Sequence, residues 1–208
     1  MRIACSLGSL LSVEEVLQCT QIISDTKIDS IWIPETWGME NFSMLGAVAN
    51  KTKTQKIGSS IINIYSRSPS TISMGAATTD TLSNGRLILG LGTSSVPIVE
   101  DFHGEKFETP VQRMREYVEI IRLSLTKKQI NYSGKIFDLK NFTLLIEPQR
   151  QSIPIYLAAI NQKMVNLCWE IADGVIFYLR PIDEMKKTIS KMQSQKNIDV
   201  ACQIITCI

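Results

Sequence analysis

The stretch of residues 57–94 constrains the fold of this chain more than any other. It begins with an apolar, β-branched run at 57–62 and ends with a second, largely apolar run at 86–91, as parallel strands buried on both faces do. Between the two runs, Ser68 and Pro69 are suited to begin a helix, because serine caps helix N-termini and proline fits the first helical position. The stretch therefore predicts a βαβ unit.

Candidate binding residues follow each of these two strands. Ligands of parallel α/β sheets and barrels bind where strands end and loops begin, so the side chains at these ends are informative. Polar residues there indicate a site, although Thr93 and Ser94 could equally serve only to complete a turn. The candidates are Ser60, Ile61 and Asn63 after the first strand, and Thr93 and Ser94 after the second.

Strands and helices alternate along the rest of the chain. Residues 12–27, 43–52, 162–171 and 183–194 have the spacing of helices, and Pro110 begins a long helix with an apolar stripe. Further strands are predicted at 2–7, 29–33, 153–159, 175–178 and 200–207, with two short strands around a turn at 131–144. Seven main strands thus alternate with helices.

This alternation is compatible with a doubly wound sheet and with a (β/α)8 barrel. No GxGxxG or GxxxxGK[ST] motif follows a strand, which removes the usual sequence argument for a Rossmann or P-loop domain and favours the TIM barrel. A typical TIM barrel has an eighth strand and about 250 residues, so we expect residues 1–208 to form a single barrel domain that lacks the last strand and helix. An uncovered sheet edge of this kind favours a homo-oligomer.

The composition narrows the classes of partner. The net charge is only +2, from 22 basic and 20 acidic residues, which is far from the charge expected of a nucleic-acid-binding protein. Five cysteines without a CxxC pair and a single histidine support neither a disulfide framework nor a metal site. No run of about 18 apolar residues occurs, so no membrane partner is expected. We expect a cytoplasmic protein that acts on a small molecule.

Six segments resemble, in their order and spacing, those of one known family. They are DSIWIPETWG, INIYSRSP, DTLSNGRLILGLGTS, FHGEKFETPVQRMREYVEIIR, PIYLAAINQKM and EIADGVI. The set resembles the bacterial-luciferase-like superfamily, and most of all its branch of oxidoreductases that use the deazaflavin coenzyme F-420, such as methylene-tetrahydromethanopterin reductases. The likeness extends from about the first strand to Tyr178.

The resemblance implies where the cofactor lies. A barrel of this family holds the ring across the carboxyl ends of the strands, supported by a non-proline cis peptide that would fall at Ser60-Ile61. The family's reductases usually carry a carboxylate at the end of the first strand, where this chain has Ser6, and commonly a glycine where this chain has Ile160 and Asn161. The other implied cofactor contacts are Glu35 after the second strand, Thr93 and Ser94 after the fourth, and a backbone phosphate grip at Ala158, Ala159 and Ile160, with Asp173 and Gly174 nearby.

The reaction implied by the resemblance is hydride transfer at C5 of the deazaflavin. The protein then needs mainly to hold the ring and the substrate about 3 to 3.5 Å apart and to exclude water. Glu35 and His103, on loops expected at the same end of the barrel, are the candidate proton donors. The alternative for Glu35 is a solvated loop carboxylate, and for His103 a structural loop residue.

Three functions remain open. The leading hypothesis is an F-420-dependent oxidoreductase that acts on a CH-NH or CH-OH group of a small organic substrate. Methylene-tetrahydromethanopterin is one candidate, although Ser6 in place of a carboxylate speaks against it. The second function is an FMN-dependent monooxygenase on the same fold. The third is a non-catalytic, truncated flavin-binding member of the family.

Overall fold

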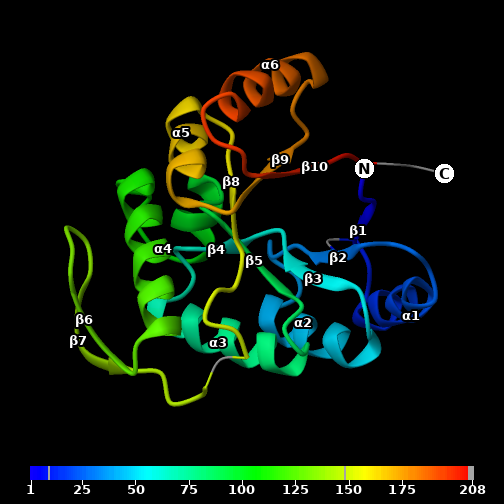
Figure 1. The fold of residues 1–208 in the computed structure, drawn as a ribbon, viewed down its shortest axis with the longest axis horizontal. Coiled ribbons are helices and arrows are strands. Elements are labelled where there is room, and N and C mark those ends of the chain that lie inside the picture. Colours follow the sequence, from blue (N-terminus) through cyan, green and yellow to red (C-terminus); the bar gives the residue numbers. More distant parts are fainter. Residues whose placement is uncertain (9, 148, 206–208) are drawn as a thin grey trace.

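The computed structural model describes residues 1–8, 10–147 and 149–205, in which strands and helices alternate (Figure 1). The strands are β1 (Ala4–Ser6), β2 (Ser30–Ile33), β3 (Lys56–Ser59), β4 (Ile62–Asn63), β5 (Leu87–Gly92), β6 (Gln129–Ser133), β7 (Asp138–Thr143), β8 (Ile155–Ala158), β9 (Gly174–Tyr178) and β10 (Asp199–Gln203). The helices are α1 (Val13–Ser24), α2 (Asn41–Lys51), α3 (Pro69–Leu82), the short π-helix η1 (Ile98–Phe102), α4 (Pro110–Thr126), α5 (Gln162–Ile171) and α6 (Ile182–Gln193).

The strands form a nearly closed parallel barrel. Seven of them are neighbours in the order β1-β2-β3-β5-β8-β9-β10, and the short β4 also pairs with β5. Where β10 comes back to β1, side chains join the two strands: Gln203 Nε2 donates to Ser6 Oγ over 3.0 Å, and Arg2 forms an ion pair with Asp199. The predicted TIM-barrel architecture is confirmed for these seven strands.

Side chains alternate between the two faces of the barrel wall, as the period of a strand requires. Ile31, Leu89 and Phe177 point outward and are fully buried beneath the helices. A separate inner cluster consists of Trp32, Ile88, Tyr156 and Ile176.

Two glycines on the inner face make room for the rings of this cluster. A Cβ atom at Gly58 would lie 2.5 Å from the Trp32 ring, and one at Gly174 would lie 2.7 Å from the Tyr156 ring. The two aromatic rings lie 5.8 Å apart, centroid to centroid. Glycine at both positions therefore permits two large side chains to extend into the interior of the barrel.

Several local predictions are confirmed. Ser12 and Glu15 form a capping box at the start of α1, and the Ser68 side chain caps α3. Residues 131–144 fall in the hairpin β6–β7, which pairs with no other strand in the described part of the chain. Glu116 on α4 anchors this hairpin, because its buried carboxylate accepts the backbone N–H groups of residues 135–137.

Some boundaries differ from those predicted. The single strand expected at 57–62 is divided into β3 and β4, with the cis peptide Ser60-Ile61 between them. The backbone pairing of β3 with β5 stops before Ser59, and the Ser59 hydroxyl bonds β5 in its place. It donates to the Gly90 carbonyl over 2.8 Å and accepts a hydrogen bond from the Gly90 N–H over 2.7 Å. The last strand ends at Gln203, and the predicted extension to Cys207 lies partly outside the described residues.

Candidate functional site

The carboxyl ends of the strands form a single rim. Glu35, Ser60, Thr93 and Ala158 follow or end β2, β3, β5 and β8, which are consecutive neighbours in the parallel sheet. Parallel strands that pair side by side end at the same edge. The predicted gathering of these four positions at one end of the barrel is therefore confirmed.

The peptide bond between Ser60 and Ile61 is cis, as the resemblance implied. The Ile61 side chain lies over Gly92 at the end of β5, where a Cβ atom would come within 2.4 Å of it. Ile61 also packs against the inner cluster of the barrel. The turn after β3 is thus wedged between the end of β5 and the barrel interior.

Three buried polar atoms close to this turn have no hydrogen-bond partner: Asn41 Oδ1, Ser60 Oγ and Asn63 Nδ2. The other ends of the two amides are engaged, since Asn41 Nδ2 donates to the Ile33 carbonyl over 2.7 Å and Asn63 Oδ1 accepts the Tyr65 N–H over 3.0 Å. Buried polar atoms are normally paired, so unpaired ones at a rim indicate a place where a polar ligand binds. A flat ring with polar edges, as the resemblance implies, fits such a set of donors and acceptors.

Glu35 is held by an arginine that the sequence analysis missed. Arg67 Nη1 and Nη2 donate to the two Glu35 carboxylate oxygens over 2.7 and 2.5 Å, and the Asn41 N–H donates to Oε1 over 3.1 Å. Hydrogen bonds to Glu35 are the main reason why the pKa of Arg67 is raised. Both Glu35 oxygens are thus occupied by donors, and its catalytic and cofactor-binding roles stay predictions. The solvated alternative is wrong, because the Glu35 side chain is only 13% exposed.

His103 is exposed and follows the short π-helix η1. The preceding residue, Phe102, lies edge-on to the ring of Trp37, with 5.9 Å between the centroids. The loop after β5 therefore touches the loop after β2 at the rim. The proton-donor role of His103 stays a prediction.

The predicted phosphate grip lies at the end of β8. The Ala159 N–H donates to the Ile176 carbonyl over 3.2 Å, and the Ile160 side chain is exposed. Asn161 has an extended backbone and caps α5 by accepting the Met164 N–H over 3.0 Å. The loop thus leads directly into a helix N-terminus at the rim, which is the kind of place where phosphates bind.

Asp173 and Gly174 do not lie with this loop, and that expectation is corrected. Asp173 exchanges hydrogen bonds with Ile155, the first residue of β8, and Gly174 begins β9. Residues between a helix and the following strand lie at the amino ends of the strands, so the pair lies at the opposite end of the barrel from the rim. Asp173 there accepts a hydrogen bond from Arg122 over 2.9 Å.

The remaining predicted residues belong to the rim. Ser94 has a left-handed backbone, with φ of 57°, and both Thr93 and Ser94 are half-buried. Ser6 ends β1 and accepts the hydrogen bond from Gln203. Gln203 is a second polar residue that the sequence analysis did not single out.

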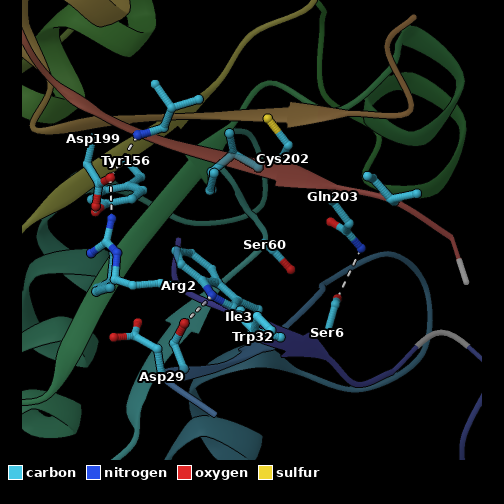
Figure 2. Close-up of a pocket in the computed structure, with 17 residues that line it drawn as sticks. Arg2, Ile3, Ser6, Asp29, Trp32, Ser60, Tyr156, Asp199, Cys202 and Gln203 are labelled. Atoms are coloured by element: carbon cyan, nitrogen blue, oxygen red, sulfur yellow. Dashed lines mark hydrogen bonds and ion pairs between the residues drawn. The ribbon is translucent and has the colours of Figure 1, made fainter. Parts of the chain in front are cut away.

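A cavity of about 340 Å³ runs along the inside of the barrel beside β1 and β10 (Figure 2). Ser6, Ser60 and Gln203 line it at the carboxyl end. Arg2, Asp199 and Tyr156 line it at the amino end, where Tyr156 and Arg2 both donate to Asp199. Burial and the hydrogen bond to Asp199 both raise the pKa of Tyr156. Arg2 and Asp199 are therefore bonded to each other at the amino end, where Asp29, the ion-pair partner of Lys56, also lines the cavity. The carboxyl end of the cavity is lined by the neutral polar side chains of Ser6, Ser60 and Gln203.

Neither a cluster of metal ligands nor a membrane-spanning helix is present in residues 1–8, 10–147 and 149–205. No three His, Cys, Asp or Glu side chains come together there as they would need to do to hold a metal ion. No helix in the same residues combines the length and the hydrophobicity that are needed to cross a bilayer.

Comparison with curated proteins gives relatives that are named as a reductase and as an oxidoreductase. The 5,10-methylenetetrahydromethanopterin reductase of Archaeoglobus fulgidus is 37% identical over 157 residues, which are 75% of this chain and 46% of the relative. A putative coenzyme F-420-dependent oxidoreductase of Mycobacterium tuberculosis is 34% identical over 168 residues, with 74% of this chain and 48% of the relative covered. The chain spans about half the length of the curated relatives it matches.

Solved structures share the fold. The F-420-dependent tetrahydromethanopterin reductase of Methanopyrus kandleri superposes with a TM-score of 0.87 at 23% identity, over 97% of this chain and 65% of that one. An FMN-bound type II Baeyer-Villiger monooxygenase of Pseudomonas putida superposes with a TM-score of 0.79 at 14% identity, over 97% and 66%. The family described as luciferase-like monooxygenase matches residues 2–208. This chain belongs to that family.

Proposed function

We propose that this chain is the barrel of an F-420-dependent oxidoreductase that transfers hydride between the deazaflavin and a small organic substrate. The observation that carries the proposal is the rim itself, where three unpaired buried polar atoms surround the turn after β3. The putative F-420-dependent oxidoreductase from Mycobacterium tuberculosis, which is 34% identical, supports F-420 as the cofactor. The reductase from Archaeoglobus fulgidus, which is 37% identical, supports a reductase activity.

When bound, the deazaflavin would supply the hydride, and the residues of the chain would supply position and exclusion of water. Asn41, Ser60 and Asn63 would give hydrogen bonds to its polar edge, and the wedged Ile61 would support one face of the ring. The backbone of residues 158–160 and the start of α5 would hold the phosphate. His103 is the proposed proton donor, because imidazole exchanges protons readily near neutral pH.

The proposed substrate class is a compound with a CH-NH or CH-OH group at the reacting carbon. The relative from Archaeoglobus fulgidus favours a reduced pterin such as methylene-tetrahydromethanopterin. The neutral polar side chains of Ser6, Ser60 and Gln203 at the rim end of the cavity suit an uncharged reacting group, because burying a charge without a partner is costly.

A second candidate is an FMN-dependent monooxygenase. It is favoured by the description of the matching family and by the FMN-bound neighbour from Pseudomonas putida. Such an enzyme would need reduced FMN and oxygen in place of F-420. A non-catalytic flavin-binding role is the third.

A titration of the purified chain separates these candidates. F-420 and FMN are added in turn, and quenching of their fluorescence gives a Kd for each. Tighter binding of F-420 supports the proposed oxidoreductase, and tighter binding of FMN supports the monooxygenase. Binding of F-420 without reduction of any pterin or oxidation of any alcohol supports the non-catalytic role, whereas binding of neither cofactor overturns all three.

A further inference from the structure

We propose that Arg67, Glu35 and Asn41 form a positioning network that fixes the turn after β3 in the conformation that the cofactor requires. The inference rests on the proposed function, since it concerns the cofactor ring at the rim. Arg67 is the positioning residue, because the other members are held through it. The three residues come from three segments: the loop after β4, the loop after β2 and the first turn of α2.

The first contact of the network is a bidentate ion pair between Arg67 and Glu35. Both terminal nitrogens of Arg67 donate to Glu35, one to each oxygen, at 2.7 and 2.5 Å. The Arg67 and Glu35 side chains are only 16% and 13% exposed. A planar guanidinium that meets a carboxylate in this way fixes direction as well as distance, and little water is present to replace either partner.

Further contacts hold the guanidinium in place. Arg67 Nη2 also donates to Glu40 Oε1 over 2.5 Å, and the guanidinium lies 5.8 Å from the centre of the Phe42 ring. The Tyr117 hydroxyl donates to the backbone carbonyl of Arg67. Contacts from α2 and α4 thus hold Arg67 in place independently of its ion pair with Glu35.

The network then reaches the turn through Asn41. The Asn41 N–H donates to Glu35 Oε1 over 3.1 Å, and its side-chain amide donates to the Ile33 carbonyl over 2.7 Å. The Ser60 N–H donates to the same Ile33 carbonyl over 2.9 Å. One carbonyl therefore joins Asn41, which is fully buried, to the residue that begins the cis peptide.

This arrangement assigns Glu35 a task other than proton donation. Its oxygens connect Arg67 to Asn41, and removal of the guanidinium would leave a carboxylate that is only 13% exposed without its main partner. The loop 34–40 and the start of α2 would then loosen, and the Ser60 N–H would lose its fixed acceptor. Cofactor binding at the turn would weaken although no residue that touches the cofactor had changed.

The test compares two arginine variants of the full chain. Arg67→Met breaks the network at the rim. Arg150→Met breaks a matched pair at the amino end of the barrel, where Arg150 bonds the fully buried Asp80 and the Leu87 carbonyl. The readouts are hydrogen exchange in peptides that cover residues 57–63, without cofactor, and the Kd for F-420 and for FMN by fluorescence quenching.

The expected result is selective. Arg67→Met should speed exchange at 57–63 and weaken binding of the cofactor that the wild type prefers by about tenfold. Arg150→Met should lower the melting temperature and leave both readouts unchanged. Equal binding by Arg67→Met and wild type overturns the inference, and so does an equal loss in Arg150→Met.

Glu35→Gln provides a second route if Arg67→Met does not fold. Glutamine keeps the size of the side chain and an acceptor for the Asn41 N–H but removes the charge that faces Arg67. Faster exchange at 57–63 with weaker cofactor binding supports the network, and wild-type values for both overturn it. A wild-type chain that binds neither F-420 nor FMN overturns the proposed function and this inference together, whereas a variant that binds as the wild type does overturns only the inference.

Discussion

Ser60 gives the sharpest test of the site, because its hydroxyl forms no hydrogen bond in the folded protein without a ligand. Its Oγ is buried and has no partner, so Ser60→Ala removes no hydrogen bond of the chain. A buried polar group without a partner costs about 1 to 3 kcal/mol. The variant should therefore melt at the wild-type temperature or a few degrees above it.

Cofactor binding should respond in the opposite direction. If the hydroxyl bonds the ring, its loss removes one hydrogen bond of about 0.5 to 1.5 kcal/mol, which corresponds to a Kd about 2- to 10-fold weaker. The assays are thermal unfolding of the chain without ligand and fluorescence titration with F-420.

The adjacent serine provides the control. Ser59 Oγ bonds both backbone groups of Gly90, so Ser59→Ala should destabilise the chain by about 1 to 3 kcal/mol. It should leave the Kd almost unchanged, because its hydroxyl is already satisfied. The reasoning is refuted if Ser60→Ala melts lower than Ser59→Ala, or if F-420 binds to it as to the wild type.

Two further predictions concern stability away from the rim. Gly58→Ala should cost about 1 to 3 kcal/mol, because its Cβ would lie 2.5 Å from the Trp32 ring, and Trp32→Phe in the same chain should restore part of it in thermal unfolding. Glu116→Gln should cost about 2 kcal/mol by weakening the anchor of the β6–β7 hairpin. Burial alone would raise the pKa of Glu116, but hydrogen bonds from Gln112 and three backbone N–H groups lower this pKa below the ordinary value of a glutamate. The wild type should therefore lose stability as the pH falls through the lowered pKa, and Glu116→Gln should show a flatter pH dependence; equal slopes would contradict this.

The barrel could be predicted from the sequence because its determinants are local. Runs of buried residues mark the strands, and the caps Ser12 and Ser68 mark helix starts. Once the strands are parallel and adjacent, the residues after them must meet at one end. Positions 35, 60, 93 and 158 were therefore predictable as a group without any knowledge of contacts.

What could not be predicted depends on contacts between distant segments. Arg67 lies 32 residues from Glu35, and only the folded sheet, in which β3 lies between β2 and β5, brings the loops after β2 and β4 together. The pairing of Tyr156 with Asp199 has the same origin. The place of Asp173, by contrast, can be predicted from the sequence, since its position between a helix and a strand indicates the amino end of the barrel.

The glycines opposite Trp32 and Tyr156 have a consequence for how this barrel can change over time. At each of these two places, the aromatic ring occupies the space that a side chain on the facing glycine would need. A homologue that enlarges residue 58 or 174 must shrink its aromatic neighbour, so substitutions at these sites should arise as correlated pairs. Ancestral or designed variants that enlarge one glycine alone should be destabilised, and those that exchange both members should reshape the interior without loss of the fold.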